Sequence, residues 1–274
     1  MKPVPFDYAR PESLEEAVAL VADVGAEARV IAGGQSLVAM LNMRLARPAL
    51  LVDVMHLPGM AAPRIERDRL LIPCAVRQAA LAGRGTLAGE VPLLAAALPW
   101  VGHPQTRARG TLCGSVAHAD PSAELPLVLV ALGGVVHLRG RSRREVAAAG
   151  FFLGTMLTER ADDELIEAVS LPLTPPGTGT AFAEIGRRRG DFAIVACAAV
   201  AQERHLRLAV GGVNDTPALR EWDGLDDSQM DDALNDFAWS LDARDDLHAT
   251  ARYRRDLVRE LGRRTLEEAR RCAA

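Results

Sequence analysis

The sequence predicts an α+β protein in two parts that divide near residue 176. Three observations support this prediction. Strand-like and helix-like hydrophobic runs alternate over roughly the first 170 residues. Residues 172–180 (PLTPPGTGT) then hold three prolines and two glycines, the composition of a linker. The runs beyond the linker read first as strands and then as helices. We therefore expect domains at 1–176 and 177–274.

The elements of the first part begin with a helix. Ser13 can cap it and Glu16 can reach back to form a capping box, and apolar residues recur at helical spacing from Leu14 to Val21. Strands are expected at 28–32, 50–54 and 69–74, with helices at 36–45, 75–83 and 90–99. This alternation predicts a small, partly parallel sheet at the front of the chain.

Residues 102–121 form a long polar segment that glycine and proline interrupt, so this segment is a candidate functional loop rather than a simple connector. A helix at 123–132 and strands at 135–139 and 164–171 complete the first part. Beyond the linker, the sequence predicts strands at 192–201 and 205–213 and helices at 227–240, 246–261 and 263–272.

Composition excludes several function classes. The net charge of −4 offers no basic surface for nucleic acid, and no run of about 18 apolar residues predicts a membrane span. The N-terminus has no secretory pattern. The four cysteines (Cys74, Cys113, Cys197 and Cys272) are widely scattered and form no C-x-x-C pair, so a metal cluster held by this chain is not expected. Reduced thiols favour a cytoplasmic location.

Two glycine-containing segments are candidates for chemistry. In residues 30–37 (VIAGGQSL), a strand runs into two glycines and a helix follows, so exposed backbone amides can close on an anion such as a diphosphate. The pattern is neither a Rossmann nor a P-loop motif. Residues 110–121 (GTLCGSVAHADP) again combine small residues with hydroxyls and a carboxylate. Taken singly, the first could be a plain tight turn and the second an Ω-loop.

Together, these segments resemble the flavin subunit of the molybdenum hydroxylases, the family of xanthine dehydrogenase and carbon monoxide dehydrogenase. The likeness extends to residues 6–17 (FDYARPESLEEA), 101–111 (VGHPQTRARGT), 181–195 (AFAEIGRRRGDFAIV) and 211–213 (GGV). The resemblance implies a two-lobed FAD-binding domain of the vanillyl-alcohol-oxidase (PCMH) type. A small three-stranded antiparallel sheet with a helical bundle would follow it.

The resemblance also implies residue roles. Residues 29–36 would wrap the FAD diphosphate, and Gly110, Thr111, Gly114 and Ser115 would hold phosphate and ribityl oxygens from the other side. Asp120 would accept a hydrogen bond from the sugar or ribityl region, and Phe192 would shield one face of the flavin ring. The full set of expected FAD contacts is Arg29, Val30, Ile31, Ala32, Gly33, Gly34, Gln35, Ser36, Leu37, Val101, Gly110, Thr111, Gly114, Ser115, Asp120, Leu165, Glu184 and Phe192.

Four positions invite separate expectations. Cys113 replaces what is often a second glycine, and we interpret it as a small apolar filler. Glu184 stands where some relatives place a lysine, so a negative charge there is expected to lower the flavin potential. His103 and His118 are interpreted as loop histidines that bond to backbone rather than as attachment points, so FAD is expected to be bound non-covalently.

The function implied by the resemblance is electron transfer within a larger enzyme. FAD would take electrons from [2Fe–2S] clusters of a small partner subunit and pass them to an outside acceptor. A large partner subunit would hold the molybdenum–pterin centre, and the assembly would be a dimer of heterotrimers. Two alternatives remain open: a free-standing flavin oxidase of the vanillyl-alcohol type, and a structural subunit without flavin.

Overall fold

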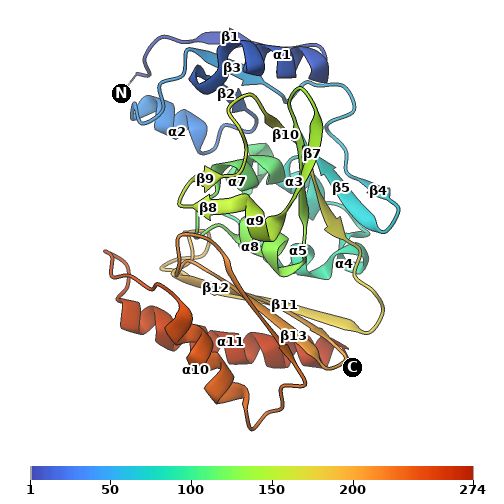
Figure 1. Cartoon of the computed structure of the whole chain (residues 1–274), viewed down its shortest axis with the longest axis vertical. Helices are drawn as coiled ribbons and strands as arrows, with labels where there is room; N and C mark the ends of the chain where they lie inside the picture. The colour runs from blue at the N-terminus through green and yellow to red at the C-terminus, as the bar shows by residue number, and fades with distance from the viewer. Residues whose placement is uncertain (1, 274) are drawn as a thin grey trace.

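The computed structural model describes residues 2–273 and arranges them in three tiers along one long axis (Figure 1). An N-terminal lobe lies at one end, a second lobe lies in the middle, and a C-terminal domain lies at the other end. Two hydrophobic cores underlie this arrangement. One fills both lobes and reaches the near face of the C-terminal sheet, and the other lies between that sheet and the last two helices. The mixture of helix and sheet confirms the predicted α+β class.

The N-terminal lobe is built on a parallel sheet with strand order β1-β3-β2. Helix α1 begins as expected, because the Ser13 side chain accepts from the Glu16 amide at 3.1 Å. The Glu16 carboxylate reaches back to the Glu12 amide at 2.7 Å rather than to the Ser13 amide. The elements of this lobe are β1 (Asp7–Ala9), α1 (Leu14–Val24), a short 3-10 helix (Gly25–Glu27), β2 (Ala28–Ile31), α2 (Leu37–Asn42) and β3 (Leu50–Asp53).

The second lobe contains a five-stranded antiparallel sheet with strand order β4-β5-β10-β6-β7. The predicted strand at 69–74 belongs here and not to the parallel sheet. The strands are β4 (Arg64–Glu66), β5 (Arg69–Pro73), β6 (Val135–Arg139), β7 (Arg143–Ala147) and β10 (Leu165–Pro172), with a hairpin of β8 (Phe152–Gly154) and β9 (Leu157–Thr158) beside them. The helices are α3 (Gln78–Ala82), α4 (Leu87–Glu90), α5 (Pro92–Ala97), α6 (Pro104–Arg109), α7 (Leu112–His118), α8 (Glu124–Ala131) and α9 (Ala148–Phe151).

The loop predicted at 102–121 is wrong in its local structure, because most of it folds into α6 and α7. Pro104 occupies the first turn of α6, where its missing N–H costs nothing. The Thr111 side chain caps α7 by accepting from the Gly114 amide at 3.0 Å. Proline and glycine therefore mark the boundaries of two short helices here.

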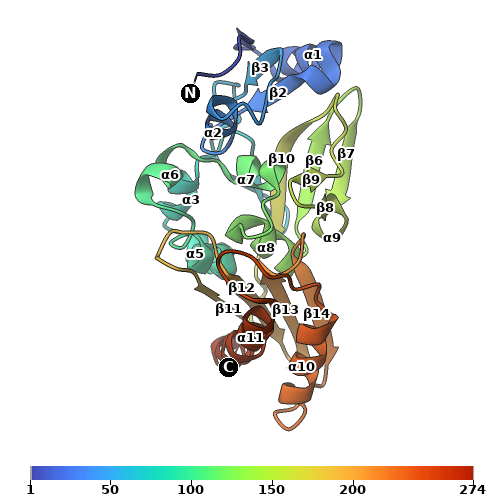
Figure 2. The same cartoon turned by 90° about the vertical axis from the view of Figure 1, so that its left-hand side faces the viewer.

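The C-terminal domain has a four-stranded antiparallel sheet in sequence order, with two helices against one face (Figures 1 and 2). Its elements are β11 (Thr178–Ile185), β12 (Val195–Gln202), β13 (His205–Gly211), β14 (Ala218–Asp223), α10 (Met230–Ser240) and α11 (Ala251–Ala273). The expected three strands become four. Residues 178–180, assigned to the linker from their glycine and threonine content, already pair with β12.

Helix α11 replaces the two helices predicted at 246–261 and 263–272. The break was expected at Gly262, but the helix runs through it. A Cβ at this position would lie 2.9 Å from a Leu208 methyl carbon and 3.2 Å from one of Leu234. Gly262 therefore lets α11 approach the sheet and α10 closely, and it does not end the helix.

Side chains along the C-terminal strands point alternately to the two faces of the sheet, and both faces are buried. On β12, Val195, Cys197 and Ala199 face the helices α10 and α11. Ala196 and Ala198 face the second lobe and belong to its core. Small residues on this second face let α8, which is buried along its whole length, pack directly on the sheet. The described residues 2–273 contain no helix long and apolar enough to span a membrane.

Candidate functional site

A cavity of about 710 Å³ lies where the two lobes and the C-terminal domain meet. Most of its walls come from four places: the turn between β2 and α2, the segment from Val101 to Glu124, the β8–β9 hairpin with the start of β10, and the loop between β11 and β12. Single residues of other elements, such as Gln78 of α3, complete the lining. Segments that are distant in the sequence therefore share one site.

The first glycine turn offers unused backbone donors to this cavity. Strand β2 ends at Ile31, and Gly34 adopts the left-handed conformation (φ 71°) before α2 begins. In the described chain, the amides of Gly33, Gly34, Gln35 and Ser36 donate to no protein acceptor. Successive free amides of this kind form a concavity that suits an anion.

The two predicted turns meet directly. A Cβ on Gly33 would lie 2.2 Å from the Arg109 carbonyl oxygen and 2.6 Å from the Gly110 Cα, so only glycine permits this approach. Gly110 packs on the Gln78 side chain, and a Cβ on Gly114 would lie 2.8 Å from the Thr111 hydroxyl. Gly33 therefore permits the close junction between the lobes, while Gly110 and Gly114 permit close packing within the second lobe.

The structure brings nearly all of the predicted residues together. Every predicted FAD contact except Ile31 and Glu184 lines the cavity. Leu165 is almost fully buried in the wall, and Asp120 is fixed by accepting a hydrogen bond from the Ser122 amide at 2.8 Å. Phe192 is 61% exposed, so its ring is available to pack on a bound ligand.

The loop that carries Phe192 is held over the cavity by the second lobe. Gly190 (φ 88°) lies against the His103 ring, because a Cβ there would come within 2.7 Å of that ring. Arg189 stacks over the Trp100 ring at 5.7 Å. His103 is therefore a packing partner of this loop, and His118 lines the cavity. Neither ring makes the backbone hydrogen bond expected of it within residues 2–273.

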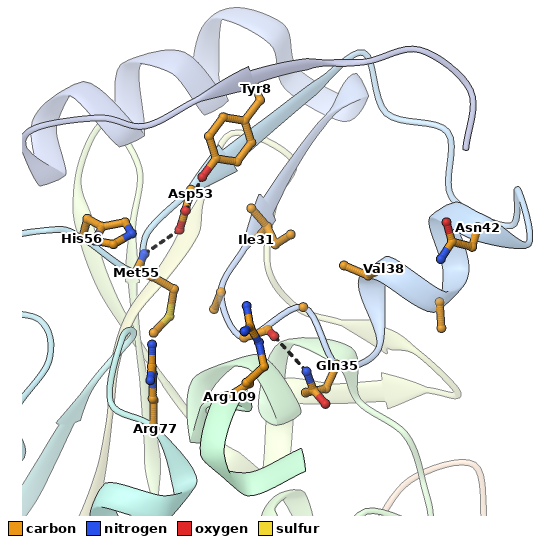
Figure 3. Close-up of a pocket in the computed structure, with 14 residues that line it drawn as sticks. Tyr8, Ile31, Gln35, Val38, Asn42, Asp53, Met55, His56, Arg77 and Arg109 are labelled. Carbon is orange, nitrogen blue, oxygen red and sulfur yellow. Dashed lines mark hydrogen bonds between the residues drawn. The ribbon is translucent and has the colours of Figure 1, made fainter. Parts of the chain in front are cut away.

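A second cavity of about 610 Å³ lies on the other side of the first glycine turn (Figure 3). Ile31 faces this second cavity. Tyr8 donates a hydrogen bond to Asp53, and Arg77 and Arg109 project into the same space from the second lobe. Neither arginine forms an ion pair within the described residues, so both place positive charge beside the free amides.

Several cavity residues escaped the sequence analysis. Gln78 is buried and its Oε1 atom has no hydrogen-bond partner, while its Nε2 donates to the Thr111 carbonyl at 3.3 Å. Met156, Leu157 and Arg160 come from the β8–β9 hairpin and the residues after it. The Leu-Gly-Thr-Met-Leu run at 153–157, with its turn residues between apolar ones, was the available signal for that hairpin.

Cys113 is a core residue, as interpreted. It is 3% exposed, its thiol donates to the Ile72 carbonyl at 3.3 Å, and burial raises the pKa of the thiol well above its usual range. A thiol held in its protonated form is a poor nucleophile.

Glu184 does not match the expectation of a simple negative charge. It is 8% exposed and does not line the cavity. Burial, together with the charge of Glu124, raises the pKa of its carboxyl group to about 8. The carboxyl group is therefore mainly neutral at pH 7. Desolvation is the physical reason, and residue type alone does not reveal it.

The residues present fit a dinucleotide such as FAD. The free amides of Gly33, Gly34 and Gln35 line both cavities and suit a diphosphate, and Arg77 and Arg109 add positive charge from the second cavity. The unpartnered Gln78 Oε1 and the hydroxyls of Thr111 and Ser115 suit a polyhydroxyl chain. The apolar wall near Leu165 and the exposed Phe192 ring suit a flat aromatic group.

Comparison with known proteins agrees with this geometry. Residues 4–174 match the family described as the FAD binding domain in molybdopterin dehydrogenase. Residues 180–269 match the carbon monoxide dehydrogenase flavoprotein C-terminal domain. These boundaries lie on either side of residue 176, and the exact division stays a prediction.

Two relatives from Paenarthrobacter nicotinovorans are each 37% identical to the chain over 98% of its length. The 6-hydroxypseudooxynicotine dehydrogenase complex subunit alpha is covered over 96% of its length. The nicotine 6-hydroxylase medium subunit is covered over 99%. Among solved structures, a chain of carbon monoxide dehydrogenase from Hydrogenophaga pseudoflava superposes with a TM-score of 0.95 at 30% identity, with both chains covered completely.

Proposed function

The chain belongs to the FAD-binding family of the molybdopterin dehydrogenases and is a medium, FAD-binding subunit of a multisubunit molybdenum hydroxylase. On that premise we propose that it relays electrons. Its FAD would accept them from [2Fe–2S] clusters of a small partner subunit and pass them to an external acceptor. A large partner subunit would hold the molybdenum–pterin centre, in a dimer of heterotrimers. We propose the cytoplasm as the compartment, because all four cysteines are free thiols.

One observation carries the proposal: Gly33 rests on the backbone of Arg109 and Gly110, so both small-residue turns open onto one cavity. FAD bound there supplies a centre that takes up electrons and passes them on. The chain's own residues would bind and orient it. The amides of residues 33–36 would hold the diphosphate from one lobe, and Gly110, Thr111, Gly114 and Ser115 would hold it from the other.

Other cavity residues would position the flavin ring. Val101 and Leu165 would pack against it, and Phe192 would shield one face from water. Asp120, whose carboxylate is already oriented by the Ser122 amide, would accept a hydrogen bond from a sugar or ribityl hydroxyl. Of the predicted FAD contacts, Ile31 lines the second cavity, and it would support the glycine turn from that side. We assign Glu184 a separate role below.

The proposal is tested by mixing the FAD-loaded chain anaerobically with its co-purified small subunit after that subunit has been reduced with dithionite. We expect loss of flavin absorbance together with return of the cluster absorbance. Acid precipitation should leave the yellow colour in the supernatant, because FAD is not covalently attached. Substrate oxidation by the purified chain alone would support a free-standing oxidase. A folded chain that takes up no FAD would support a structural subunit.

A further inference from the structure

Two buried carboxyl groups lie in the region where the C-terminal sheet packs on the second lobe, near enough for the charge of Glu124 to act on Glu184. Glu124 is the first residue of α8, is 4% exposed and lines the large cavity. Glu184 lies on β11, where strand alternation puts it on the same face as Phe182, which packs against the core of the lobes. Its neighbour across the sheet is Ala196, a fully buried alanine on the face that contacts α8.

Little stabilises the charge of either carboxyl group. The Glu184 Oε2 atom is fully buried without a hydrogen bond. The groups that favour the charged form of Glu124 are its own backbone amide and the guanidinium of Arg107. One nitrogen of that guanidinium already donates to the carbonyls of Val101 and Gly102, each at 2.9 Å.

These surroundings favour protonation. Burial, followed by the charge of Asp120, raises the pKa of Glu124 to about 7, although its own backbone amide and Arg107 act in the opposite direction. Burial and the charge of Glu124 raise the pKa of Glu184 to about 8. Two like charges in a poorly solvated site are unfavourable together, so the pair keeps at least one proton near neutral pH.

We propose that Glu124 and Glu184 form a proton-exchanging pair of the FAD site, which binds a proton when bound flavin is reduced and releases it when the flavin is reoxidised. This inference rests on the proposed function. The electrons come from the reduced cluster of the partner and leave to the acceptor. The proton comes from solvent through the cavity, forms an O–H bond on a carboxylate oxygen, and returns to solvent when that bond breaks.

The physical basis is charge compensation. Electrons that enter a poorly solvated site add negative charge there, which raises the proton affinity of a nearby carboxylate. Groups that titrate near neutral pH can respond to that change, whereas an ordinary solvated carboxylate is already ionised and remains so. The pair can therefore gain or lose a proton near neutral pH, whereas an exposed glutamate stays ionised.

The experiment is a spectroelectrochemical titration of the FAD-loaded chain between about pH 6 and pH 9.5, compared with Glu184→Gln and Glu124→Gln. At acid pH the pair is protonated in the unaltered chain, so all potentials should coincide. At alkaline pH the unaltered chain should be harder to reduce than either variant. We expect an equilibrium difference of about tenfold, about 30 mV for a two-electron couple. Glu260→Gln is the matched control, because Glu260 is an exposed glutamate on α11 that does not line the cavity.

A measurement on the unaltered chain protects the test against a variant that fails to fold. Proton uptake on reduction, followed with an indicator dye in weakly buffered solution, should exceed that of free FAD near neutral pH. Proton uptake equal to that of free FAD would overturn the proposed proton exchange. So would variants whose potentials differ from that of the unaltered chain by the same amount at every pH. Failure to bind FAD, or to be reduced by the small subunit, would instead overturn the proposed function.

Discussion

Substitution of Gly33 by alanine tests the junction between the two lobes. The added Cβ would lie 2.2 Å from the Arg109 carbonyl oxygen and 2.7 Å from its carbonyl carbon. Since ordinary contacts of this kind begin near 3.4 Å, the turn and the Arg109–Gly110 backbone must separate by about 1 Å. Both sides are backbone, so no flexible side chain can absorb the shift.

The magnitude follows from that displacement. Overpacking of a close contact typically costs about 1–3 kcal/mol of folding stability. The same movement pulls the amides of residues 33–36 away from the second turn. Loss of one or two hydrogen bonds to a charged diphosphate, at about 1.5–3 kcal/mol each, corresponds to FAD affinity that falls by about tenfold to about 10⁴-fold.

The assay is a fluorescence titration with FAD, combined with thermal unfolding with and without FAD. The control is Gly85→Ala, because a Cβ at Gly85 meets no atom within 4 Å. We expect Gly33→Ala to lose affinity and most of the stabilisation by FAD, while Gly85→Ala keeps both. If Gly33→Ala bound FAD as tightly as the unaltered chain, the inferred contact between the turns and the diphosphate would be wrong.

Three further predictions concern the surroundings of the site. The raised pKa of Glu184 (about 8, against an ordinary 4.5) gives stability that is complete below pH 4.5 and is lost as the pH rises through about 8. The free energy of unfolding measured with urea should therefore fall by a few kcal/mol at most over this pH range, and it should fall less in Glu184→Gln. Arg254→Met should lower stability by about 1–3 kcal/mol in thermal unfolding, because the Ile194 and Gly212 carbonyls lose the buried donor Arg254, while the half-exposed Asp246 can be solvated. Phe192→Ala should change stability by less than about 0.5 kcal/mol, since the ring is exposed, yet make bound flavin more accessible to iodide quenching.

The sequence predicts best where the signal is local. Ser13 with Glu16 places the start of α1, and Gly33-Gly34 after a β-branched strand places the first turn. Each feature depends on residues within one or two turns of chain. Thr111 also acts locally, since it caps α7 by accepting from the Gly114 amide, but the glycines and prolines of residues 102–121 favour a loop, and the helix is not predicted from the sequence.

The remaining features depend on tertiary packing. Gly262 would weaken an isolated helix, but it stays helical because Leu208 and Leu234 fill the space that a side chain would need. Gln78 lies in a short helix, and only the approach of the Gly110–Thr111 segment turns it into a buried cavity residue. No window of sequence around either residue contains the partner that decides its role.

Glu124 and Glu184 show the same dependence in their chemistry. A glutamate at the start of the apolar run ELPLVLVA is what the helix dipole alone would favour, and it suggests solvent exposure. Burial comes instead from the C-terminal sheet, which packs on α8 from more than fifty residues further along the chain. The pKa of each carboxyl group is therefore a property of the interface between two domains.

That interface argues for function over stability. Its sheet face is otherwise largely apolar, with Ala196 and Ala198 beside larger residues such as Phe182. A carboxyl group with an unpartnered oxygen there carries a desolvation cost that an alanine would not. If packing were the only requirement, Glu184→Ala would be the more stable chain, apart from the small cavity that it leaves. An interface that retains the less stable residue beside a cofactor cavity is expected where a binding or redox property depends on that residue. Folding stability and the pH dependence of the flavin potential should therefore change separately when Glu184 is substituted. A substitution that raised the stability and left the pH dependence unaltered would contradict a functional role for this carboxyl group.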